Sequence, residues 1–218
     1  MQALHATIFP MWLALDTFGQ DVDAAKVVKF LTAKGMACSV YAAFAFVMGL
    51  YGLGRSSDTS SSASVAAGQL ALDLMSGCDA ENSWCRMLRQ GATATMEAWN
   101  PDEKPNLSWS HPWATAPATG IAHGFMGITA ASPTYESVLV QPQVGESTVT
   151  ASLTLPTARG FVTAAVDSKP GQSFELSLNL PANTRATVYV PVSLLVCLLV
   201  DRRPSPSLSV ALSLWLSL

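Results

Sequence analysis

The chain has 218 residues, of which 50% are hydrophobic and only 12% are charged, about half the charged fraction of an ordinary soluble domain. This length allows one large or two small domains, and a net charge of −3 without a lysine or arginine cluster argues against nucleic acid as a partner. The sequence has no phosphate loop, no dinucleotide fingerprint and no G-x-S-x-G motif, and its three histidines lack metal-ligand spacing, so no metal or cofactor is expected.

The first half of the chain has the pattern of helices joined by short connections. The helices are expected over residues 2–19, 21–33, 38–53, 66–76, 83–90 and 112–127. Asp21 is the expected N-cap of the second helix, and Gly35 follows its end. The third is apolar nearly all round, which predicts burial, and it is too short to span a membrane. A Ser-rich insert at 56–64 is expected to be flexible. This pattern is typical of a helical bundle or an α/α toroid.

Beyond Pro133 the pattern changes to alternating apolar and polar residues. Strands are expected over 136–141, 147–155, 160–167, 173–180 and 186–190, separated by prolines and glycines. Helices followed by a block of strands indicate two domains. We therefore predict an α+β chain, with a helical domain over 1–131 and a small antiparallel β-domain over 132–191.

Residues 192–218 fit neither domain. Two apolar runs, 192–200 and 208–218, are separated by a charged and proline-containing break, and each is too short to cross a bilayer. A tail anchor would need one unbroken run, so a membrane is not the expected partner. The Ser-rich insert and this tail are interpreted as translated non-coding sequence, such as a retained intron or a shifted frame.

The start of the chain and its cysteines leave the compartment open. Met1 is followed by neither a basic region nor a cleavage pattern, so either the protein is not exported or Met1 is not its native start. The four cysteines include no C-x-x-C pair, which argues against zinc. Cys78 and Cys85 are near enough to form a disulfide in an oxidising compartment, but buried free thiols are the favoured interpretation.

Residues 81–117 carry the candidate site, because they hold four of the six tryptophans, one histidine and a glutamate between a Gly-Ala-Thr turn and Ala98. Pyranose ring faces stack on tryptophan while sugar hydroxyls bind charged partners, so this composition predicts a sugar-binding cleft. Three alternatives stay open: the glutamate lies on a surface helix, the histidine caps the next helix, and the tryptophans are core residues. The candidates here are Glu97, His111, Trp84, Trp99, Trp109 and Trp113.

Several segments taken together resemble the C-terminal portion of bacterial and fungal α-L-rhamnosidases. In the helical region they are residues 5–10 (HATIFP), 34–41 (KGMACSVY), 91–99 (GATATMEAW), 104–106 (KPN) and 109–113 (WSHPW). In the β-region they are residues 138–143 (VLVQPQ), 155–160 (LPTARG) and 180–183 (LPAN). The resemblance covers roughly residues 3–191 apart from the Ser-rich insert, and Ala94 and Met96 depart from the commoner pattern.

This resemblance implies part of a six-hairpin (α/α)6 catalytic domain followed by an appended β-sandwich. It implies hydrolysis of terminal α-L-rhamnosides with inversion, with Glu97 as the general base that activates water. The residues that it places in the rhamnose pocket are His111, Trp84, Trp99, Trp113 and His5.

The family's general acid lies upstream of every matched segment, so the resemblance also implies a truncated form that lacks it. An inverting mechanism needs two carboxyl groups with water between them, so this chain alone is expected to be inactive. The alternative is a non-catalytic, lectin-like protein that uses the same tryptophans. In either case the expected partners are rhamnose-containing glycosides.

Overall fold

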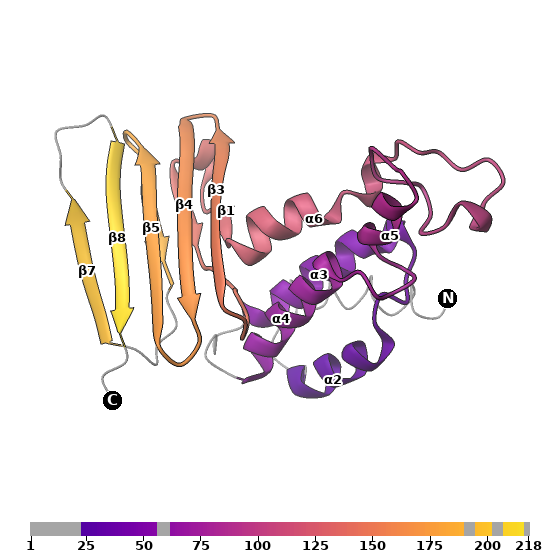
Figure 1. Cartoon of the computed structure of the whole chain (residues 1–218). Coiled ribbons are helices and arrows are strands. Elements are labelled where there is room, and N and C mark those ends of the chain that lie inside the picture. The colour runs from indigo at the N-terminus through magenta and orange to yellow at the C-terminus, as the bar shows by residue number, and fades with distance from the viewer. Residues whose placement is uncertain (1–22, 56–61, 190–194, 202–206, 216–218) are drawn as a thin grey trace. The chain divides into compact units, whose positions relative to one another are not determined.

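The computed structural model describes residues 23–55 and 62–189, together with the backbone of 195–201 and 207–215 (Figure 1). The chain divides into two compact units, residues 1–121 and 122–218. Helices form the first unit and strands form most of the second, so the predicted α+β class is confirmed. The expected helix at 2–19 and most of the Ser-rich insert lie outside the described residues.

Among the described residues, five α-helices and two short 3₁₀ turns form the helical unit. They are α2 (Ala24–Lys34), α3 (Val40–Gly54), α4 (Ser62–Ser76), α5 (Trp84–Arg89), η1 (Pro101–Glu103), η2 (Pro112–Ala114) and α6 (Ala116–Thr119). The helix predicted over 112–127 is present but divided at Thr115: η2 precedes the break, and α6 continues directly into the π-helical segment η3 (Gly120–Phe125). Pro112 and Pro117 have no backbone N–H, so each lies in the first turn of a new short helix.

Helix α2 begins later than predicted and ends as predicted. Asp23 is its N-cap, and one of its carboxylate oxygens accepts a hydrogen bond of 3.1 Å from the Lys26 N–H. Asp21, the predicted cap, lies outside the described residues. Gly35 ends the helix with a φ of 58°, and its N–H donates to the Leu31 carbonyl at 2.9 Å. Glycine adopts this left-handed conformation without steric cost.

Helix α3 contributes more buried hydrophobic residues than any other described element of the helical unit, and it packs beside α4 (Figure 1). Phe46, Leu50 and Tyr51 are at most 1% exposed, whereas Tyr41 and Phe44 are 44% and 38% exposed. The prediction of burial all round is therefore wrong for the first turns of this helix. Among the described residues, none of the helices combines the length and apolarity needed to cross a membrane.

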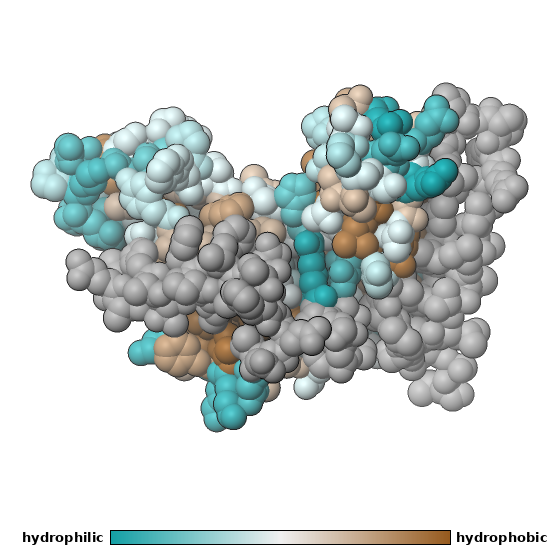
Figure 2. Space-filling view, turned by 180° about the vertical axis from the view of Figure 1, so that it is seen from behind, coloured by the Kyte–Doolittle hydropathy of each residue, from teal (hydrophilic) through white to brown (hydrophobic). Residues whose placement is uncertain are grey.

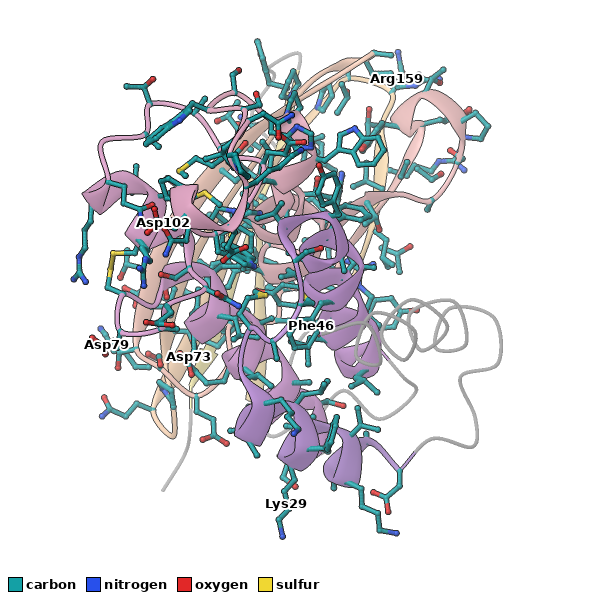
Figure 3. All side chains as sticks on the ribbon, turned by 90° about the vertical axis from the view of Figure 1, so that its right-hand side faces the viewer. Lys29, Phe46, Asp73, Asp79, Asp102 and Arg159 are labelled. Carbon is teal, nitrogen blue, oxygen red and sulfur yellow. A yellow bond between two sulfur atoms is a disulfide. The ribbon has the colours of Figure 1, made fainter. Side chains whose placement is uncertain are left out.

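Cys78 and Cys85 form a disulfide, so the interpretation of these two as free thiols is wrong (Figure 3, the yellow bond near Asp79). The Ser83 hydroxyl accepts a hydrogen bond from the Arg86 N–H and starts α5, which places Cys85 in its first turn. The turn brings the two Cα atoms to 5.0 Å, within disulfide range. Cys38 is buried and free.

Replacing Cys85 with serine is expected to lower the free energy of unfolding by about 2.5 kcal/mol, because a closed loop of this size loses that much unfolded-state entropy. Urea denaturation of the oxidised chain, with and without reductant, measures the loss. Reductant should have no further effect on Cys85→Ser. Identical midpoints for the oxidised and reduced chain would show that this bond contributes nothing.

Among its described residues, the second unit contains two β-sheets, and a strand is present at each of the five predicted positions. Its strands are β1 (Ile128–Ala130), β2 (Ser137–Val140), β3 (Val149–Thr157), β4 (Gly160–Lys169), β5 (Ser173–Pro181), β6 (Arg185–Val188), β7 (Leu195–Asp201) and β8 (Ser207–Trp215). A short turn, η4 (Pro133–Tyr135), joins β1 to β2. One sheet has the order β1-β2-β6 and the other β3-β4-β5-β8-β7. Pairing is antiparallel except between β2 and β6, which are parallel.

Alternation along β5 creates the inner face of the larger sheet. Phe174, Leu176, Leu178 and Leu180 are at most 3% exposed, and the residues between them are more exposed. Burying each of these side chains contributes about 2 kcal/mol. Two mainly antiparallel sheets, the larger of which has an apolar face, are consistent with the predicted sandwich-like domain. On the face shown in Figure 2, hydrophilic residues cover much of the described surface and hydrophobic patches are smaller.

The tail that was expected to fit neither domain extends the larger sheet. Strand β8 pairs antiparallel with β5, with Ser209 opposite Asn179, and β7 pairs with β8. Residues 207–214 alternate serine or another small residue with a leucine or valine, which is the period of a strand. From the sequence, this segment was interpreted by the length of its apolar runs, and that criterion does not reveal an alternation with a period of two.

Candidate active site

The candidate site is built on a loop, residues 95–111, that folds back on itself. The Glu97 N–H donates to the Ser108 carbonyl at 2.9 Å, and the His111 N–H donates to the Thr95 carbonyl at 2.7 Å. The Thr95 hydroxyl also donates to the His111 carbonyl at 2.7 Å. These bonds fix the two ends of the loop side by side. Glu97 therefore lies in a bend of this loop and not on a surface helix.

Three donors surround the Glu97 carboxylate, whose side chain is 14% exposed. Its Oε1 accepts hydrogen bonds from the Tyr41 hydroxyl at 2.9 Å and from the Lys104 ammonium, which also forms an ion pair with it. Its Oε2 accepts from the Ser108 N–H at 3.0 Å. The donors come from α3 and from the loop itself. Segments that are distant in the sequence thus meet at one carboxylate.

These donors keep Glu97 ionised. The Lys104 hydrogen bond, then the Ser108 N–H and the Tyr41 hydroxyl, lower the pKa of Glu97 to about 2. The same contact raises the pKa of Lys104, and the hydrogen bond to Glu97 raises the pKa of Tyr41. A carboxylate with this pKa carries no proton near neutral pH. It therefore has no proton to donate to a leaving group, and it is in the form that can accept one, although its low pKa makes it a weak base.

An aromatic cluster of Tyr41, His111 and Trp113 adjoins the carboxylate. The Tyr41 ring lies edge-on to the rings of His111 and Trp113, with centroids 5.1 and 5.6 Å away. Trp113 is 70% exposed, so its indole is open to a ligand. His111 is the N-cap residue of η2, but its side chain makes no capping bond. Its buried Nε2 has no hydrogen-bond partner among the described residues.

Trp84 and Trp99 are core residues in this structure. They are 8% and 1% exposed, and their rings contact each other edge-on at 5.0 Å. Their indole N–H groups donate to the carbonyls of Ala114 and Cys38, at 2.7 and 2.6 Å. The structure thus brings Glu97, His111 and Trp113 together around Tyr41 and keeps these two indoles buried. That these residues line the rhamnose pocket, as the resemblance implies, stays a prediction.

Two residues that contact Glu97 were not among the predicted site residues. Tyr41 is 56 positions from Glu97, and Lys104 follows η1. Both lie in segments that carry the family resemblance, 34–41 and 104–106. This position is the signal by which the sequence could have identified them as site residues. His5 lies outside the described residues.

The helical unit also has an apolar cavity of about 370 Å³, with Met75, Trp84, Met87 and Thr95 among the residues that line it. Within the described ranges, no three metal-ligating side chains cluster together. The arrangement offers acid–base chemistry at one carboxylate beside an exposed aromatic surface.

The solved structures with a similar fold include three α-L-rhamnosidases. The α-L-rhamnosidase of Streptomyces avermitilis, complexed with L-rhamnose, has a TM-score of 0.68 and 19% identity over 96% of this chain and 21% of that one. That of Aspergillus terreus has a TM-score of 0.61 and 18% identity over 84% and 22%. That of Dictyoglumus thermophilum has a TM-score of 0.59 and 14% identity over 78% and 21%. The chain thus spans about a fifth of the length of these proteins.

The sequence itself matches one family model. Residues 127–198 match the bacterial α-L-rhamnosidase C-terminal domain, and this match extends past β6 into β7. No curated protein matches the sequence. The predicted resemblance is therefore confirmed: the chain is similar to the C-terminal part of α-L-rhamnosidases, in sequence over 127–198 and in fold over most of its length.

Proposed function

We propose that this chain serves the hydrolysis of terminal α-L-rhamnosides with inversion, and that Glu97 is the general base. The observation that carries the proposal is an ionised carboxylate beside an aromatic cluster with an exposed indole. The likeness to α-L-rhamnosidases, one of them complexed with L-rhamnose, supplies the substrate class. The helical unit would then correspond to part of the (α/α)6 domain predicted over 1–131, and the strands β1 to β8 to the β-sandwich predicted over 132–191.

In this reaction Glu97 takes a proton from a water molecule as that water attacks the anomeric carbon. A second carboxyl group, placed across the sugar, protonates the departing oxygen. Among the described residues, Glu97 is the one carboxylate that bonds to Tyr41 or Lys104. The resemblance places the family's acid upstream of this chain, so the expected inactivity is narrowed here to rhamnosides whose leaving group requires protonation.

The proposed pocket consists of His111 and Trp113, supported by Trp84, Trp99 and His5. Replacing Trp113 with alanine is expected to weaken L-rhamnose binding about two- to twelvefold, because an aromatic contact is worth about 0.5–1.5 kcal/mol. Titration of L-rhamnose by ligand-observed NMR measures the dissociation constant.

The matched control is Phe161→Ala, which removes an exposed aromatic residue from β4 and should leave binding unchanged. D-glucose should not compete. No saturable L-rhamnose signal from the unmodified chain, or equal loss in both variants, would contradict the proposed pocket.

A further inference from the structure

We propose that Lys104 and Tyr41 are positioning residues, which together hold Oε1 of Glu97 and leave Oε2 as the oxygen that accepts the proton from water. This inference rests on the proposed function of Glu97 as a base. It assigns different roles to the two oxygens of one carboxylate.

The count of hydrogen bonds distinguishes these oxygens. Each carboxylate oxygen has two lone pairs. Oε1 accepts from both Tyr41 and Lys104, so its two lone pairs are engaged. Oε2 accepts only from the Ser108 N–H among the described residues, so one lone pair remains. The Glu97 side chain retains 14% exposure, which allows water to reach that position.

The backbone around Lys104 directs its side chain back to Glu97. Asn100 caps η1 by accepting a hydrogen bond of 3.2 Å from the Asp102 N–H. The turn ends at Lys104, whose carbonyl accepts from the Leu107 N–H at 3.2 Å. Lys104 is 37% exposed and Glu97 is its one ion-pair partner among the described residues.

Tyr41 approaches the carboxylate from a different element. It is the second residue of α3, and its ring contacts His111 and Trp113. One side chain therefore touches both the base and the proposed sugar surface. Tyr41 fixes the distance between them, while Lys104 prevents the carboxylate from exchanging its two oxygens by rotation.

A titration tests the contact without requiring activity. In ¹³C NMR of the chain with labelled glutamate, the Glu97 carboxyl signal is the one that is missing from Glu97→Gln. This signal should titrate near pH 2. Lys104→Met should move this midpoint upward toward the ordinary value of 4.5, and Tyr41→Phe should move it less. Lys104→Arg should restore most of the shift. An unchanged midpoint in both Lys104→Met and Tyr41→Phe would overturn the proposal.

The same variants give a stability signature with a defined sign. The pKa of Glu97 in the folded chain is below its ordinary value, so the Lys104–Glu97 contact stabilises the fold fully above about pH 4.5. This stabilisation is lost as the pH falls through about 2. Lys104 is the charged group in contact with Glu97 among the described residues, and Tyr41 contacts it through a neutral hydroxyl. The stability difference between the unmodified chain and Lys104→Met should therefore vanish in acid. A difference that persists there would indicate a packing effect.

Kinetics separate a positioning role from a structural one. With dinitrophenyl α-L-rhamnoside as substrate, Lys104→Met should lower kcat about tenfold or more with little change in KM, since only the base is misplaced. If the Glu97 titration midpoint shifts in Lys104→Met while kcat stays unchanged, the positioning role is overturned. No turnover by the unmodified chain would instead count against the base assignment itself, so the two failures are distinguishable.

Discussion

Replacing Glu97 with glutamine is expected to slow the hydrolysis of 2,4-dinitrophenyl α-L-rhamnoside by about 10²- to 10⁴-fold. Dinitrophenolate departs without being protonated, so this substrate needs the base alone. Glutamine preserves the shape of the side chain and can still accept a hydrogen bond from the Tyr41 hydroxyl. It cannot take a proton from water. The loss therefore measures the base function and not the integrity of the loop.

The experiment compares initial rates of dinitrophenolate release by the two proteins near neutral pH. The control variant is Glu103→Gln, an exposed carboxylate in η1, which should retain the full rate. Proton NMR of the first product should show the inverted anomer, β-L-rhamnose. Equal rates for Glu97→Gln and the unmodified chain would remove Glu97 from the mechanism. Rhamnose binding without turnover of this activated substrate would favour the lectin-like alternative.

A rhamnoside with an alkyl leaving group gives the complementary result. Its departing oxygen needs a proton from a second carboxyl group. Turnover of such a substrate by this chain, abolished in Glu97→Gln, would show that another residue of the chain supplies the acid. The pair of substrates thus tests the two carboxyl roles separately.

The alternating strands were predictable because one buried face imposes a period of two on the sequence. Phe174 and the leucines that follow it on β5 show this without tertiary information. The end of α2 was equally predictable from local sequence, since Gly35 adopts the left-handed backbone conformation that ends the helix. The break between η2 and α6 was not predicted, because the apolar pattern over 112–127 was given more weight than the missing N–H group of Pro117.

The candidate site was only half predictable. Glu97, His111 and Trp113 lie within one stretch of sequence, so composition drew attention to them. Tyr41 joins them only because the first turn of α3 lies against this loop, and no local pattern encodes a contact across 56 positions. The disulfide posed the same difficulty at short range, since the turn between Cys78 and Cys85 decides whether the two sulfur atoms meet.

Replacing Trp99 with alanine is expected to lower the free energy of unfolding by about 3–5 kcal/mol. Trp99 is 1% exposed, and the cavity left by the indole would be lined by groups that cannot collapse into it fully. The Cys38 carbonyl would also lose its donor. Chemical denaturation measures the change, and Trp99→Phe should cost less because it retains an aromatic ring against Trp84.

The matched variant is Trp113→Ala, which should change stability by no more than about 0.5 kcal/mol because its indole is 70% exposed. Similar losses of stability at both positions would contradict the division into a buried and an exposed tryptophan.

The burial of Trp99 also bears on the position of the base, Glu97. Trp99 lies two residues after Glu97, and its indole N–H is bonded to Cys38, three residues before Tyr41. This buried bond holds the loop against the start of α3, so the Glu97–Tyr41 contact depends on a tryptophan that does not itself face the sugar.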